Sequence, residues 1–231
     1  MIPFIASNNK LTYGVKALGL LVLSIFLTQF LWSNVSFTEL TQISKPSTSF
    51  AFIQLGAASF TNLAMGHLMF VLSLFLFGSK HEFVMKQLVV FTLTHMLTLW
   101  LGAFNVIPFS PYIAQALALL STVYIAGENI FAFKLKSLRV TAVAICGLVH
   151  GFAMSSHLHE AGVTEGAFGK SLLMYNLGME LAIACFAVPA FLIFVKLAAG
   201  KHYSKAFFNI ASGALVLLAS YYTVNQLLIT N

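Results

Sequence analysis

The chain has 231 residues, of which 59% are hydrophobic and only 8% are charged, with 23 phenylalanines and no aspartate. Ordinary soluble domains carry roughly a quarter charged residues, so this chain lacks the polar groups to cover a surface that faces water. The composition excludes a soluble enzyme, a secreted disulfide scaffold and a disordered chain. The formal net charge of +6 does not indicate nucleic acid, because the cations stand in short clusters between apolar blocks.

Apolar blocks of about twenty residues recur along the chain, which is the length of one helix that crosses a bilayer. The spans of a β-barrel would be about ten residues long and strictly alternating, and no such pattern occurs. We therefore predict an all-α, polytopic membrane bundle with seven transmembrane helices in a lipid bilayer. In chain order the predicted helices cover residues 15–32, 56–79, 87–107, 112–133, 140–156, 171–195 and 206–228.

Residues 1–231 are predicted to form a single transmembrane domain. Residues 1–55 hold the first helix and a polar linker outside the membrane, residues 56–195 form the core, and residues 206–228 form the final helix. The first block is interpreted as a retained helix, because it is long for a signal core and Ser33-Asn34-Val35 is a poor cleavage site; a cleaved signal peptide stays the alternative. Glycines on three core positions are predicted to allow close helix contact: Gly147, Gly151 and Gly178.

The distribution of Lys and Arg predicts the orientation. Lys45 and Lys170 fall at one set of helix ends, and the other ten cations fall at the opposite set. Because cytoplasmic loops carry the excess of Lys and Arg, the N-terminus is predicted to be cytoplasmic and the C-terminus outside. The ten residues assigned to the cytoplasmic side are Lys10, Lys16, Lys80, Lys86, Lys134, Lys136, Arg139, Lys196, Lys201 and Lys205.

Five ionisable side chains lie inside predicted helices, each on a different one: His67, His95, Glu128, His150 and Glu180. A charged side chain in the bilayer core costs at least ~2.5 kcal/mol, so a chain that retains several is expected to use them. At about 1.5 Å per residue, the three histidines come out between roughly 12 and 18 Å above the cytoplasmic edge. Glu180 lies nearer the outside and Glu128 nearer the inside.

Three neutral imidazoles and a carboxylate suit a borderline divalent cation such as nickel, cobalt, zinc or copper, whereas Mg²⁺ and Ca²⁺ prefer oxygen ligands. We therefore predict a transition-metal site near the midplane, with Glu180 as the outer acceptor and Glu128 as the inner exit. The residues expected to support these ligands are Asn176, Asn129, Tyr124 and Thr98. Two other interpretations stay open: a proton relay through the same groups, and buried histidines that only hydrogen-bond between helices.

These polar positions stand in segments that together resemble the HupE/UreJ family. The segments are Gly66–Leu72, Phe91–Leu99, Glu128–Asn129, Gly147–Gly151 and Asn176–Glu180, and the resemblance covers about residues 56–195. It implies a bacterial inner-membrane permease, often encoded beside hydrogenase or urease genes and linked to nickel or cobalt uptake.

The chain departs from the pattern of the family in its early motif. That motif has a histidine, five residues and then an Asp-His pair, whereas here Phe60 and Gly66 replace the first two polar groups and only His67 remains. Gln115 also stands where relatives often carry a glutamate. These replacements remove potential ligands and two negative charges.

The leading hypothesis is a secondary permease whose cargo is nickel or cobalt, with no catalytic residue. No phosphate-cradling loop occurs, so ATP hydrolysis is not expected. The first alternative is an intramembrane metal-dependent enzyme, in which three histidines hold Zn²⁺ with an open position that activates water. The second is a binding or assembly membrane protein with a vestigial metal site, which the losses at Phe60 and Gly66 suggest.

Overall fold

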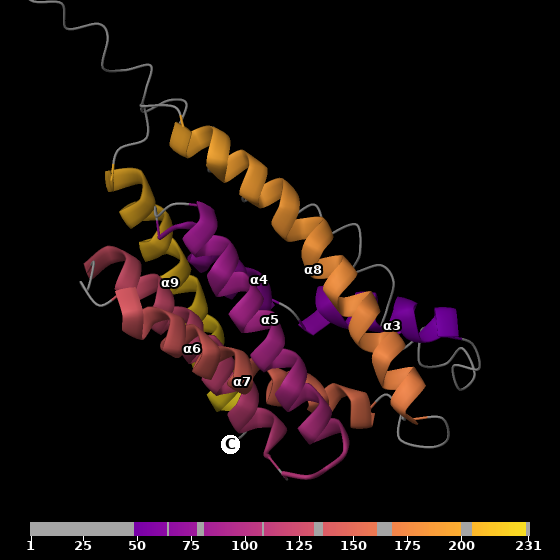
Figure 1. Ribbon diagram of the computed structural model, residues 1–231. Helices are drawn as coiled ribbons and strands as arrows, with labels where there is room; N and C mark the ends of the chain where they lie inside the picture. Colours follow the sequence, from indigo (N-terminus) through magenta and orange to yellow (C-terminus); the bar gives the residue numbers. More distant parts are fainter. Residues whose placement is uncertain are drawn as a thin grey trace, which may run out of the picture.

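The computed structural model describes residues 49–63, 65–77, 81–107, 109–131, 136–160, 168–199 and 205–229. Nearly all of them are helical and none of these described residues forms a strand, which confirms the predicted all-α class. The first predicted helix and the linker up to residue 48 lie outside the described residues. Residues 49–55, predicted to belong to the polar linker, instead form the start of a helix, because this stretch is already apolar. The helices are α3 (Ser49–Leu63), α4 (Met65–Phe75), α5 (His81–Ala103), α6 (Pro111–Phe131), α7 (Lys136–Glu160), α8 (Phe168–Ala199) and α9 (Lys205–Ile229) (Figure 1).

Four helices are long and apolar enough to cross a membrane, over Glu82–Ala103, Tyr112–Phe131, Leu138–Ser155 and Lys205–Leu228. Their polarity is reversed relative to a soluble bundle. On α5 the large apolar side chains Leu93 and Leu97 are exposed, whereas His95 between them is completely buried. Lipid in place of water explains such a surface, and the protein is therefore a membrane protein. Seven crossings and the orientation of the termini stay predictions.

The prediction of one continuous helix over residues 56–79 is wrong. The segment contains two helices instead, since α3 ends at Leu63 and α4 begins at Met65. With 15 and 11 residues they are about 22 and 16 Å long, and neither reaches across the ~30 Å hydrocarbon core alone. Hydropathy did not reveal the break because both helices are apolar.

Helix α3 packs on α8, and the two ribbons cross in Figure 1. Glycines from both helices make this contact possible. A Cβ atom on Gly56 would collide with the backbone carbonyl of Tyr175, and one on Gly178 would collide with that of Ile53. The role predicted for Gly178 in close helix contact is thereby confirmed, and the packing gives α3 a direction of its own.

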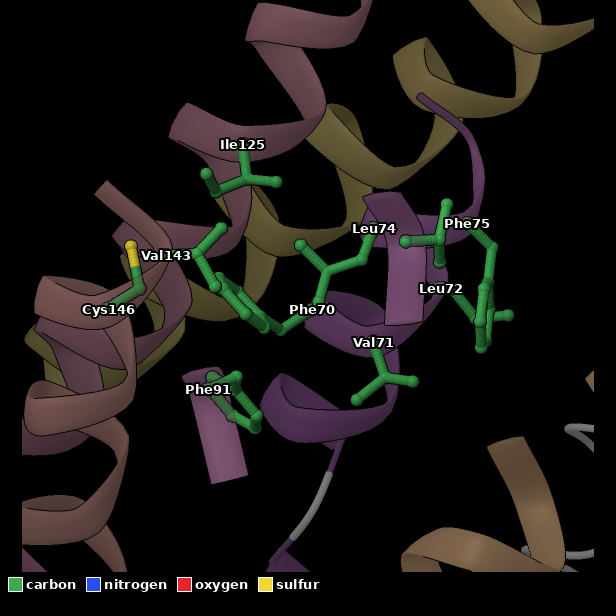
Figure 2. Close-up of a cluster of buried hydrophobic side chains, with 10 residues drawn as sticks. Phe70, Val71, Leu72, Leu74, Phe75, Phe91, Ile125, Val143 and Cys146 are labelled. Atoms are coloured by element: carbon green, nitrogen blue, oxygen red, sulfur yellow. The ribbon is translucent and has the colours of Figure 1, made fainter. Parts of the chain in front are cut away.

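Helix α4 lies in the middle of the bundle, in contact with α5, α6, α8 and α9. Every side chain from Leu68 to Phe75 is buried, so the short helix is apolar and enclosed on all sides. Its side chains join those of α5, α6 and α7 in one apolar cluster, most of which Figure 2 shows. This enclosure holds the N-terminal turn of α4, which carries His67, inside the protein.

Candidate functional site

The structure brings the three predicted imidazoles together from three helices. His67 lies on α4, His95 on α5 and His150 on α7. The ring centroid of His67 lies 4.4 Å from that of His150 and 4.9 Å from that of His95. All three side chains are buried, with at most 4% of any of them exposed. We call these three residues the histidine cluster.

Two hydrogen bonds order the histidine cluster. The Nδ1 atoms of His67 and His150 lie 3.2 Å apart, and Nε2 of His150 lies 2.9 Å from Oγ of Ser121 on α6. Within the part of the chain that the structure describes, Nε2 of His67 and both ring nitrogens of His95 have no hydrogen-bond partner. An unsatisfied buried polar atom costs about 1–3 kcal/mol, so three of them in one cluster favour a role in binding.

Aromatic rings form an apolar wall along the histidine cluster. The Phe91 ring lies between 5.4 and 5.8 Å from each of the three imidazoles, measured between centroids. Phe70 stacks on Phe91 at 4.7 Å and lies 4.8 Å from the ring of His150. Figure 2 labels both phenylalanines in the apolar cluster that surrounds α4. The wall keeps water from this side of the imidazoles and restricts the rotation of their rings.

Close contact between α5 and α7 positions His95 and His150. A Cβ atom on Gly151 would collide with the carbonyl oxygen of His95 and with Oγ1 of Thr98. Thr98, predicted to support His95, donates its hydroxyl within α5, with acceptor carbonyls of Thr94 at 3.2 Å and of His95 at 3.3 Å. Its side chain therefore lies at the helix contact beside both imidazoles.

Glu128 has a cationic partner that the sequence does not indicate. Its Oε2 atom accepts a hydrogen bond from Nη1 of Arg139 at 2.9 Å, and both side chains are buried. The sequence places Arg139 among the cations at the predicted cytoplasmic helix ends and gives no sign of its burial, whereas only 1% of this residue is exposed. The predicted inner exit residue is thus one half of a buried ion pair.

Further groups surround the guanidinium of Arg139. Its Nε donates to Oε1 of Gln87 at 2.7 Å, its Nη2 donates to Oδ1 of Asn129 at 2.9 Å, and the Phe77 ring lies 3.9 Å from its central carbon. Asn129 in turn donates to the carbonyl of Ser73 at 2.8 Å, which ties α6 to α4. Asn129, predicted to support a metal ligand, therefore orients Arg139.

The remaining predicted supporting residues have different environments. Tyr124 is 56% exposed and lies on the outer surface of α6. Asn176 on α8 is buried, and neither its amide oxygen nor its amide nitrogen has a partner among the described residues. One helical turn further on, Oε1 of Glu180 is likewise buried without a described partner. Since α8 contacts α4 and α5, this pair lies on a helix that adjoins those of His67 and His95.

The donor atoms of the histidine cluster do not surround a common point. Among the described residues, no group of three or more His, Cys, Asp or Glu side chains is arranged to hold a metal ion. The hydrogen bond between His67 and His150 occupies one nitrogen of each ring. A cation would therefore use fewer than three of these imidazoles, or turn at least one ring.

A comparison with known protein families identifies the family of the chain. The model for HupE / UreJ proteins matches residues 36–226. The chain belongs to the HupE/UreJ family. No curated protein and no solved structure matches it. The match to the HupE/UreJ model confirms the resemblance seen in the sequence and extends it beyond residues 56–195 in both directions.

Two departures from the HupE/UreJ pattern can be placed in the structure. Gly66 is buried, and a Cβ atom there would make an ordinary contact with Leu119 at 3.4 Å. Gln115 on α6 accepts a hydrogen bond from Nε2 of Gln226 on α9 at 2.6 Å, so it joins two helices. The side chain of Phe60, the third departure, lies outside the described residues.

Sequence reasoning missed Ser121 and the burial of Arg139. Ser121 precedes Glu128 by seven residues, which is two helical turns, so both lie on the same face of α6. That spacing was the available signal for Ser121. No comparable signal existed for Arg139, because a cation at the end of an apolar block is typical of a membrane surface.

Proposed function

We propose that this HupE/UreJ protein is a secondary permease of the bacterial inner membrane for a divalent transition-metal cation, with nickel or cobalt as its cargo. The observation that supports the proposal most is the histidine cluster: three buried imidazoles from three helices in ring contact. Imidazole is a ligand that suits nickel and cobalt, and such groups are expensive to keep inside a membrane. Membership of the family points in the same direction.

The proposed path begins at α8. Glu180 offers a buried carboxylate oxygen without a described partner, so it is the proposed outer acceptor. The cation then passes to His67, His95 and His150. Inward movement is favoured by ~2.3 kcal/mol per charge for each 100 mV of membrane potential, so no ATP is required.

The proposed inner exit at Glu128 depends on Arg139. While the ion pair is closed, Arg139 cancels the charge of the carboxylate and repels a cation. Release to the inside would therefore require the two side chains to separate. In the closed arrangement the proposed exit at Glu128 is therefore blocked.

The first test replaces single histidines of the cluster. We expect His95→Ala, and equally His150→Ala, to abolish uptake of radioactive nickel or cobalt into proteoliposomes, because each removes an imidazole from the path. His202→Ala is the matched control, since His202 falls between α8 and α9 in the sequence. Uptake that is unchanged in the cluster variants, with insertion intact, would rule the proposal out.

A second measurement separates a permease from the alternative of an intramembrane zinc enzyme. A resident catalytic metal stays bound through dialysis, whereas a cargo ion that must leave the site is released. We expect element analysis of dialysed protein to find far less than one metal ion per chain. Stoichiometric zinc that disappears in His95→Ala would favour the enzyme instead.

A further inference from the structure

The hydroxyl of Ser121 determines the direction of the hydrogen bonds in the histidine cluster. Its Oγ lies 2.7 Å from the carbonyl oxygen of Ala118, which can only accept. The single hydroxyl proton is therefore donated to Ala118. Oγ also has a hydrogen-bond contact with the Cys146 thiol and lies 2.9 Å from Nε2 of His150. Because its own proton goes to Ala118, the contact with His150 requires the imidazole to donate. Nε2 of His150 consequently carries the proton, and the hydrogen bond of the His150 ring with the backbone of Ala118 agrees with this direction.

The protonated nitrogen of His150 also determines which nitrogen of His67 is protonated. A neutral imidazole has one N–H donor and one acceptor nitrogen, so Nδ1 of His150 is an acceptor. The 3.2 Å contact between the Nδ1 atoms then requires His67 to donate from its Nδ1. Nε2 of His67 is then unprotonated and has a free lone pair. This atom is buried and has no hydrogen-bond partner among the described residues.

We propose that Ser121 is a positioning residue that holds His67 and His150 in opposite tautomers and thereby directs the free lone pair of His67 Nε2 to the cargo cation; this inference rests on the proposed permease function. The ligands in this conformation are His67 and His95, whose ring centroids lie 4.9 Å apart and whose unpartnered nitrogens are buried. His150 stands behind His67 and accepts its N–H.

The arrangement matches how proteins treat metal-binding histidines. Such a histidine usually donates its second ring N–H to a partner, which fixes the tautomer and makes the ligand nitrogen more basic. Here the partner of His67 is His150, whose own partner is Ser121, and the hydrogen bonds run in one direction to Ala118. In this arrangement His150 accepts a hydrogen bond instead of binding the cation, which agrees with the absence of a three-ligand site among the described residues.

The test measures the tautomers directly, without any metal. In solid-state ¹⁵N spectra of the histidine-labelled, metal-free protein in lipid bilayers, we expect protonated Nδ1 for His67 and protonated Nε2 for His150. In Ser121→Ala we expect this pattern to be lost and the affinity for nickel to fall about 10- to 100-fold. Ser121→Thr keeps a hydroxyl at the same place and is expected to restore both. If Ser121 had only a structural role, its replacement would not change the tautomers of His67 and His150.

Ser155→Ala is the matched control. Ser155 is a buried serine on α7 that donates to the carbonyl of Phe152 at 2.9 Å, as Ser121 does to Ala118, and it has no bond to an imidazole. We expect this variant to leave the tautomers and the affinity unchanged.

Two outcomes overturn different parts of the scheme. Protonated Nε2 on His67 in the unmodified protein, or an unchanged pattern in Ser121→Ala, overturns the role of Ser121 and leaves the permease intact. The expected spectra in a protein whose nickel uptake does not respond to His67→Ala overturn the permease, and with it the role of His67 as a ligand.

Discussion

At the scale of single residues, the buried Arg139 shows what a charge inside a bilayer protein requires. Its guanidinium has hydrogen-bond partners in Glu128, Gln87 and Asn129, and the ring of Phe77 covers it. Each contact offsets part of the cost of removing the cation from water. Because the two charges compensate each other, neither is expected to be tolerated without its partner.

We expect Arg139→Met to lower the free energy of unfolding by about 3 kcal/mol or more, because Glu128 is then buried without a partner. The double variant Glu128→Gln with Arg139→Met should recover much of this loss. Unfolding of the protein in mixed micelles, followed by circular dichroism, measures both. Lys205→Met replaces an exposed cation and is the control. A double variant no more stable than the single one would contradict the coupling.

At the scale of helices, glycine spacing determines how α5 and α7 meet. Gly147 and Gly151 are four residues apart, so they lie on one face of α7. A Cβ atom on Gly147 would collide with Oγ1 of Thr94, just as one on Gly151 would collide with the backbone at His95. The close approach sets the register of the two helices, and therefore the relative height of His95 and His150.

Gly151→Ala is expected to destabilise the protein by about 1–3 kcal/mol and to reduce cation uptake, because the new methyl group meets a backbone carbonyl that cannot rotate away. Gly127→Ala on α6 is the matched control, since a Cβ atom there meets nothing within 4 Å. It should be neutral or stabilising by up to about 1 kcal/mol through helix propensity. Thermal unfolding with parallel uptake assays compares them, and equal effects would refute the packing argument.

At the scale of the whole molecule, the exterior of the helices is apolar and the interior contains the polar groups. Helix α4 is enclosed by its neighbours, whereas α5, α6 and α9 expose large apolar side chains along their length. Only a hydrocarbon environment is compatible with this surface. The orientation in that environment follows from the Lys and Arg asymmetry and stays a prediction.

Cysteine labelling tests the orientation. In a variant that lacks Cys146 and Cys185, Ser110→Cys between α5 and α6 should react with an impermeant maleimide added to intact cells. Lys136→Cys at the start of α7 should react only after permeabilisation, because the cationic ends are predicted to face the cytoplasm. The opposite pattern would reverse the assigned orientation.

The sequence was most informative about the level of single polar residues along their helices. The depths of His67, His95 and His150 along their helices were sufficient to predict that they share one level, and the structure places their rings in contact. The sequence was least informative about which side chains contact one another between helices. Arg139 has the local signature of a surface cation, and only the rotation of α7 against α5 and α6 buries it.

The class of the protein and its helical character were determined by the sequence alone, because the length and polarity rules of a bilayer act locally along the chain. Its family was indicated by short motifs, which are equally local. Tertiary structure decided the break between α3 and α4, the Glu128–Arg139 pair and the bond from His150 to Ser121. These features depend on which helix faces come together. Hydropathy does not distinguish a face that meets lipid from one that meets an apolar neighbour, so packing alone settles them.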